Sequence, residues 1–192
     1  MKKQHFNAIF ISLISFFLMT GFGFFGDDET PDEQRKKLQE TKSATMKKLY
    51  TLDPAAKQYI ANSYGYAAFN NIGINLLVVS TANGDGIAHN NKTGKDIYMT
   101  MFSAGVGIGA GVKDFRGVFV FANAKVFNYF VEEGWQAGAQ TDAAAKSGDK
   151  GESHQLAIDV APGVKLYQMT EAGLALQATI QGTKYMKNDD LN

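Results

Sequence analysis

A glycine at every second position over one stretch limits the fold of this chain more than any other feature. Residues 103–121 have the sequence SAGVGIGAGVKDFRGVFVF, with glycines at positions 105, 107, 109 and 111. Alternate side chains of a β-strand point to opposite faces, so one face of this strand would carry only backbone. Glycine weakens a strand unless a bend, another backbone or a ligand requires it. The stretch therefore predicts a bent or closely packed central strand.

The same glycines imitate a dinucleotide-binding fingerprint, Gly105-x-Gly107-x-x-Ala110. That motif needs a helix that begins within it, because the pyrophosphate binds at the helix N-terminus. Here the glycines continue at a period of two and lead through Lys113 and Asp114 into another apolar strand. This pattern favours the structural interpretation over a nucleotide site, and we predict no cofactor.

The rest of the chain alternates between helical and strand patterns. Helical spacing and capping residues predict helices over residues 31–52, 54–60 and 123–132. Strand-forming runs occupy residues 64–69, 74–81, 97–102, 118–121, 135–139, 156–160, 164–169 and 174–180. Turn signals at residues 70–71, 83–86 and 90–94 separate the first of them.

Short connections between successive strands predict mostly antiparallel pairing. We therefore expect an α+β fold: a single domain over residues 34–192, in which a strongly bent, nearly closed and mostly antiparallel sheet is covered by N-terminal helices. One further helix is inserted between strands.

The first 26 residues predict export from the cytoplasm. Lys2 and Lys3 precede an apolar run over residues 6–25, and an acidic stretch follows it. This is the layout of a secretory signal peptide, although a run of about 20 residues is also long enough for an uncleaved membrane anchor. Both interpretations place the domain in the periplasm or cell envelope, with residues 27–33 as a linker.

Composition and motif spacing argue against catalysis. Basic and acidic residues balance at 19 each, which gives no electrostatic basis for binding nucleic acid, and the chain has no cysteine. His5, His89 and His154 lack the spacing of a zinc site, and no GxSxG nucleophile motif occurs. We therefore predict a protein that is not an enzyme and holds no metal, with Ser103 in a structural role.

The helix predicted over residues 31–52 carries basic residues opposite an apolar side formed by Leu38, Thr41, Thr45, Leu49 and Leu52. Four lysines form two rows whose members lie eleven residues apart, about three helical turns: Lys36 with Lys47, and Lys37 with Lys48. This arrangement suits anionic lipid headgroups. Glu33 and Glu40 can pair with lysines four residues away, so a solvated outer helix face is the alternative.

Several short motifs, in their order along the chain, resemble the SYLF-domain family. They are PAAK at residues 54–57, GYAAF at 65–69, SAGVGIGAG at 103–111, GVFVF at 117–121, GWQAG at 134–138, and GLA at 173–175 followed by Gly182. The resemblance covers about residues 34–187. One departure is Asn70, which stands where the family usually has proline.

The resemblance implies lipid binding through an N-terminal amphipathic segment and its basic residues. By position it points to Arg35, Lys36, Lys37, Lys42, Lys47 and Lys48. Eukaryotic members bind phosphoinositides and some fungal relatives bundle actin. For an exported chain, anionic phospholipid is the expected ligand, and actin is a partner only in a eukaryotic context.

We therefore expect a non-catalytic lipid- or membrane-surface-binding module of the cell envelope. The alternative is a structural or protein-interaction component of the envelope that does not depend on lipid.

Overall fold

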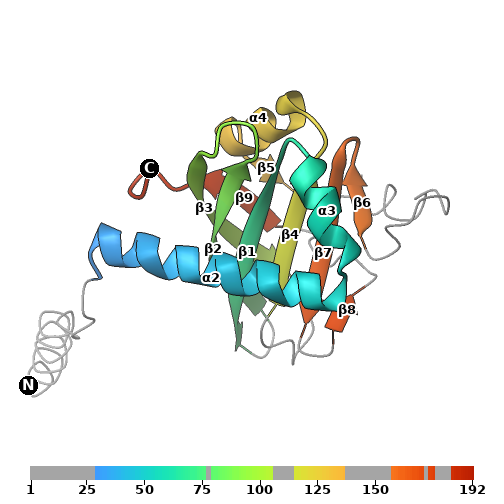
Figure 1. Ribbon diagram of the computed structural model, residues 1–192. Coiled ribbons are helices and arrows are strands. Elements are labelled where there is room, and N and C mark those ends of the chain that lie inside the picture. Colours follow the sequence, from blue (N-terminus) through green and yellow to red (C-terminus); the bar gives the residue numbers. More distant parts are fainter. Residues whose placement is uncertain (1–28, 77–78, 106–114, 137–156, 171–172, 176–182) are drawn as a thin grey trace, which may run out of the picture. The chain divides into compact units, whose positions relative to one another are not determined.

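The computed structural model describes residues 29–76, 79–105, 115–136, 157–170, 173–175 and 183–192 (Figure 1). Within these ranges, the unit from Pro31 to Asn192 contains three helices and nine strands. The helices are α2 (Pro31–Leu52), α3 (Ala55–Asn62) and α4 (Ala124–Glu132). The strands are β1 (Gly65–Leu76), β2 (Val79–Asn90), β3 (Asp96–Gly105), β4 (Phe115–Phe121), β5 (Trp135–Gln136), β6 (Ile158–Ala161), β7 (Val164–Thr170), β8 (Gly173–Ala175) and β9 (Thr183–Lys187).

All nine strands belong to one sheet, in the order β5-β9-β3-β2-β1-β4-β7-β6, with β8 paired to β7. Every pairing is antiparallel. The sheet is strongly curled into a half-barrel, and α2 lies across several of its strands (Figure 1). The predicted α+β fold with a bent antiparallel sheet is confirmed.

The sheet has a buried core on each face, which we call the α2 face and the α4 face. On the α4 face, aromatic rings pack around Phe119, whose centroid lies 4.9 Å from that of Tyr185 and 5.3 Å from that of Phe130. On the α2 face, Met46 and Leu49 pack with Ala68, Val118, Val120 and Tyr167. Strand alternation separates the two sets, so that neighbours in β4 serve different cores.

The helix α2 begins at Pro31, so residues 31–33 belong to this helix and not to the linker predicted over residues 27–33. The ring of proline fixes φ near its helical value, and Asp32 and Glu33 interact favourably with the partial positive charge of the helix N-terminus. The predicted extent of the helix, residues 31–52, is confirmed.

Local capping explains the other two helices. Asp53 Oδ1 accepts from the backbone N–H of Ala55 at 3.1 Å ahead of α3, and Asn123 Oδ1 accepts from Val126 N at 3.2 Å in α4. Gly134, with φ of 75°, follows the end of α4. Each side chain satisfies a helix N–H that has no partner within the helix, as the sequence predicts.

Two predicted turns are wrong. Residues 70–71 lie inside β1 and residues 83–86 inside β2, and these two strands pair along their whole lengths. Gly86 serves close packing instead of a turn: a Cβ atom there would clash with the Phe69 ring and lie 2.5 Å from Ala68 O. The turn predicted at residues 90–94 is confirmed, with φ of 72° at Gly94.

Several predicted features lie outside the described residues, namely residues 1–26, Gly107, Gly109, Gly111 and His154. Gly105 is the last residue of β3 and pairs with Ser80. The strand β9, which pairs with β3, has no counterpart among the predicted strands. No helix in the described ranges combines the length and the apolar character needed to cross a membrane.

Candidate functional site

The inward side of α2 contains both apolar and charged contacts with the sheet. Its buried residues are Thr45, Met46 and Leu49, all in its second half. Leu52, predicted on the apolar side, has an exposed fraction of 38%. Near the middle of the helix, Gln39 and Lys42 contact the sheet through polar side chains.

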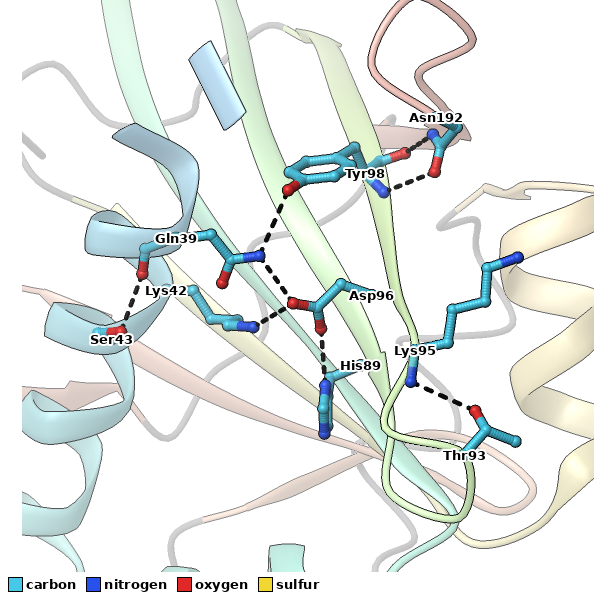
Figure 2. Close-up of polar contacts among 9 residues, drawn as sticks. All are labelled: Gln39, Lys42, Ser43, His89, Thr93, Lys95, Asp96, Tyr98 and Asn192. Atoms are coloured by element: carbon cyan, nitrogen blue, oxygen red, sulfur yellow. Dashed lines mark hydrogen bonds and ion pairs between the residues drawn. The ribbon is translucent and has the colours of Figure 1, made fainter. Parts of the chain in front are cut away.

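The carboxylate of Asp96, at the start of β3, is the centre of these polar contacts (Figure 2). Gln39 Nε2 and Lys42 Nζ each donate to Oδ2 at 2.7 Å, and His89 Nδ1 lies 2.6 Å from Oδ1. Antiparallel pairing of β2 with β3 places His89 opposite Asp96, and a three-residue spacing places Gln39 and Lys42 on one side of α2. The carboxylate therefore ties the helix to two strands.

The electrostatics of this cluster keep Asp96 ionised. Burial raises the pKa of Asp96, but hydrogen bonds from Lys42, Gln39 and His89, together with the charge of Lys42, outweigh burial and lower the pKa below its ordinary value. Only 13% of the Lys42 side chain is exposed. The carboxylate is thus a fixed negative charge at neutral pH, with both oxygens already engaged by the protein.

Two tyrosines lie next to this cluster. The centroid of the Tyr66 ring lies 5.2 Å from that of His89. Burial, followed by the nearby Tyr50 and Asp96, raises the pKa of Tyr66 to about 12, and burial also raises the pKa of Tyr50. Both phenols are therefore neutral at physiological pH. The described ranges contain no group of three or more acidic, histidine or cysteine side chains arranged to hold a metal ion.

A second tie links the beginning of α2 to the C-terminal segment, residues 188–192. Arg35 Nε donates to Leu191 O at 2.9 Å, and its guanidinium also pairs with Asp32 at 2.7 Å. Asn192 binds the backbone of Tyr98 on β3, donating to its carbonyl at 2.7 Å and accepting from its N–H at 3.0 Å. The start of α2 is thus fixed to β3 through the C-terminal segment.

The six basic residues predicted by resemblance do not share one surface. Arg35 and Lys42 point inward, to Leu191 O and Asp96 respectively. Lys36, Lys37 and Lys47 are exposed, and Lys48 is half-buried. By helical geometry the rows Lys36/Lys47 and Lys37/Lys48 lie on the side of α2 away from Met46 and Leu49. The structure therefore separates two inward cations from the outward lysine rows.

Other candidate residues have structural partners. Trp135 is partly buried and packs against Phe119 and Tyr185 of the core on the α4 face. Asn91, in a triplet that matches a glycosylation acceptor, donates from its amide to Ile60 O at 2.7 Å and to Ser63 O at 3.2 Å. Ser103 lies in β3.

Sequence reasoning missed the Asp96 cluster. Gln39, Asp96 and His89 come from α2 and two strands, and 54 residues separate Lys42 from Asp96 along the chain. One local signal was available: Lys42 lies four residues before Met46 and seven before Leu49, which places it on the same side of the helix as these apolar residues. A lysine at that position indicates a carboxylate on the opposing sheet.

Comparison with known proteins gives one informative match. No protein-family profile matches the chain. The chain is 35% identical over 163 residues to Beta cell expansion factor A of Aeromonas veronii, a match that covers 85% of this chain and 60% of that protein. The chain thus spans about three fifths of the length of this curated relative.

Proposed function

We propose that this domain is a non-catalytic module that binds anionic lipid headgroups at a membrane surface through the outward side of α2. The observation that carries the proposal is the division of α2 into two sides. Contacts of the inward side fix the helix on the sheet, and Lys36 and Lys47 lie exposed on the other side. A fixed helix presents its cations without paying the entropy of ordering a flexible chain.

The expected strength follows from electrostatics. A lysine close to an anionic membrane surface contributes about 1 kcal/mol, and the effect decays over a Debye length of about 10 Å at 0.1 M salt. Two rows of lysines along three turns of helix would therefore support weak, salt-sensitive binding. Arg35 and Lys42, held by Leu191 O and Asp96, are expected to contribute little while α2 remains docked.

We also propose that the chain is a SYLF-domain protein, which the order of its motifs supports. Two motif glycines are required by close packing of the fold. A Cβ atom on Gly65 would lie 2.6 Å from His89 O, and one on Gly134 would lie 2.7 Å from Tyr185 O. Gly134 also has a φ of 75°, which other residues rarely adopt.

Export is the third part of the proposal. We infer from the sequence of residues 1–26 that they act as a signal peptide or an N-terminal anchor and place the domain in the periplasm or cell envelope. Anionic phospholipid is then the ligand class, and a protein partner in the envelope is the alternative.

Flotation of residues 27–192 with vesicles tests the proposal, because the apolar run over residues 6–25 would itself insert into neutral vesicles. Vesicles of phosphatidylcholine with and without phosphatidylglycerol should separate anionic from neutral binding, and we expect flotation only with the anionic lipid at low salt. The triple variant Lys36→Gln, Lys37→Gln, Lys47→Gln should lose most of the bound fraction. The charge-matched control Lys92→Gln, Lys125→Gln, Lys184→Gln changes three exposed lysines outside α2 and should float like the wild type.

Equal losses in the two triple variants would show that overall charge, and not α2, determines binding. Absence of flotation at low ionic strength would contradict lipid binding and favour an interaction role without lipid dependence.

A further inference from the structure

The two parts of α2 are held on the domain in different ways. The three buried side chains of the helix, Thr45, Met46 and Leu49, all lie in its second part. None of residues 31–42, which we call the N-terminal arm, is buried. Buried apolar side chains keep a helix in place because their exposure to water is unfavourable, whereas a polar contact can be exchanged for another polar partner. The arm is therefore the part of α2 that can leave the sheet without opening the core.

Polar side chains hold the arm in place. Arg35 Nε donates to Leu191 O at 2.9 Å, and Gln39 Nε2 and Lys42 Nζ each donate to Asp96 Oδ2 at 2.7 Å (Figure 2). The one leucine of the arm, Leu38, is half-buried. Water or an external anion can replace each of these acceptors, so the net stabilisation is much smaller than the strength of the bonds in isolation.

The junction between the arm and the rest of α2 has the features of a hinge. Thr41, Ser43 and Thr45 have lower helix propensities than the neighbouring lysines. Ser43 Oγ donates to Gln39 O at 2.9 Å (Figure 2), a type of bond that often bends helices. Thr45 Oγ1 is buried and has no hydrogen-bond partner among the described residues, which costs free energy while the helix is straight and docked. A bend at residues 43–45 would let water reach this hydroxyl.

Release of the arm would not leave an isolated charge in the core. Asp96 would keep His89, whose Nδ1 lies 2.6 Å from Oδ1 and which belongs to β2 and not to the helix. The Asp96 side chain is already 22% exposed, and departure of the arm would open it further to water. At an anionic surface, Lys42 would exchange one anionic partner for another. Arg35 would exchange a neutral carbonyl for a charged headgroup, which forms stronger hydrogen bonds.

We propose that docking of the arm is an autoinhibitory contact. At an anionic membrane the arm swings off the sheet about residues 43–45, and Arg35 and Lys42 join the outward lysines at the lipid headgroups. This inference rests on the function proposed above and concerns its regulation. The released state is the minor one in solution, so the apparent affinity for the membrane is reduced by the fraction of molecules that are released.

Distances between spin labels test the movement. The chain has no cysteine, so labels can be placed by substitution at exposed positions of residues 27–192. The pair Glu33→Cys and Lys92→Cys reports on the arm, and the pair Thr51→Cys and Lys92→Cys reports on the anchored end of α2. After addition of phosphatidylglycerol vesicles, with labelled protein diluted in unlabelled protein, we expect the 33–92 distance distribution to shift and widen. The 51–92 distribution should stay unchanged.

Asp96→Asn tests the contact that holds the arm, because it removes the charged acceptor of Gln39 and Lys42. We expect it to widen the 33–92 distribution already without vesicles and to raise the affinity for phosphatidylglycerol vesicles by about tenfold, the effect of a lost hydrogen bond to a charged group. The control Asp159→Asn makes the same change in net charge at the pair with Lys165 and should alter the affinity by less than about twofold.

Lys42→Gln, combined with Asp96→Asn, separates binding from docking. In this background Lys42 has already lost its carboxylate partner, so the second substitution removes a membrane cation and should weaken vesicle binding by about fivefold. Lys92→Gln in the same background is the matched control and should have no effect. Equal binding in the two combined variants would show that Lys42 does not reach the membrane and would overturn the proposal.

Three other outcomes would also overturn it. The first is a 33–92 distance that is unchanged both by vesicles and by Asp96→Asn. The second is equal affinity of the Asp96→Asn and Asp159→Asn proteins for vesicles. The third is a 51–92 distance that widens together with the 33–92 distance in Asp96→Asn, because the domain would then unfold as a whole. All three are compatible with flotation of the wild type through its outward lysines, whereas absence of flotation would contradict the proposed function and this inference with it.

Discussion

Lysines of the same helix, α2, have different roles, which side-chain type alone does not reveal. Lys42 has the same charge as Lys36 and Lys47, but it is nearly buried against Asp96, whereas the other two are exposed. Burying an ammonium group costs free energy unless a carboxylate accompanies it. The role of Lys42 is thus set by Asp96, a residue that local sequence around the helix does not reveal.

Replacing Asp96 should destabilise the domain. Asp96→Asn leaves Lys42 without its counter-ion and weakens the contacts of Gln39 and His89, and we expect a loss of about 2 kcal/mol in the free energy of unfolding. Urea denaturation measures this loss. Asp159→Asn, which breaks the more exposed pair with Lys165, is the matched control and should cost about 0.5 kcal/mol. Equal effects of the two substitutions would show that Asp96 does not hold α2 on the sheet.

The stabilisation by Asp96 should depend on pH. Because the pKa of Asp96 is lower in the folded state than in the unfolded chain, its ionised form stabilises the fold above the unfolded pKa of about 3.9. The stability difference between wild type and Asp96→Asn should therefore be constant near neutral pH and shrink as the pH falls below about 4. A difference that stays constant down to pH 2 would contradict this origin of the stabilisation.

At the scale of elements, helices were easier to predict than strand ends. Asp53 and Asn123 cap α3 and α4 through bonds to residues two or three positions away, so the signal is local. Residues 70–71 and 83–86 carry equally strong local turn signals, but they lie within paired strands. Cross-strand pairing and the fit of Phe69 over Gly86 outweigh the local preference there.

Two leucines of α2 test how this helix packs on the sheet. A helical-wheel projection places both of them on the apolar side. Leu49 is fully buried and Leu52 is 38% exposed. Leu49→Ala should lower the free energy of unfolding by about 2–5 kcal/mol, whereas Leu52→Ala should cost less than about 1 kcal/mol. Chemical denaturation of both variants measures the contrast, and similar losses would mean that α2 packs differently from the arrangement described.

At the scale of the whole domain, the C-terminal segment connects elements that are far apart in the chain. Leu191 is buried, its carbonyl accepts from Arg35, and its neighbour Asn192 binds the backbone of Tyr98. The same segment lines an open hollow of about 350 Å³ between β3 and the end of α4. The geometry of α2, β3 and the hollow therefore depends on a few residues at the end of the described chain.

Leu191→Ala tests this dependence. We expect a loss of about 2–3 kcal/mol in the free energy of unfolding, because the side chain is buried where three segments meet. Urea denaturation measures this loss. Asp190→Ala, at the exposed neighbouring position, is the control and should leave the stability unchanged. A Leu191→Ala protein with wild-type stability would show that the segment does not brace the domain.

The sequence by itself determined the α+β class, the antiparallel pairing, the extent of α2 and the caps of α3 and α4, because these follow from periodicity and from contacts a few residues apart. Only the tertiary structure decided which residues partner the inward basic side chains and where the ionic cluster and the hollow form. Those features join α2, β3, α4 and the C-terminal segment across 54 to 156 residues of chain. Their partners depend on how the sheet curls and which strands become neighbours, and no local pattern encodes that choice.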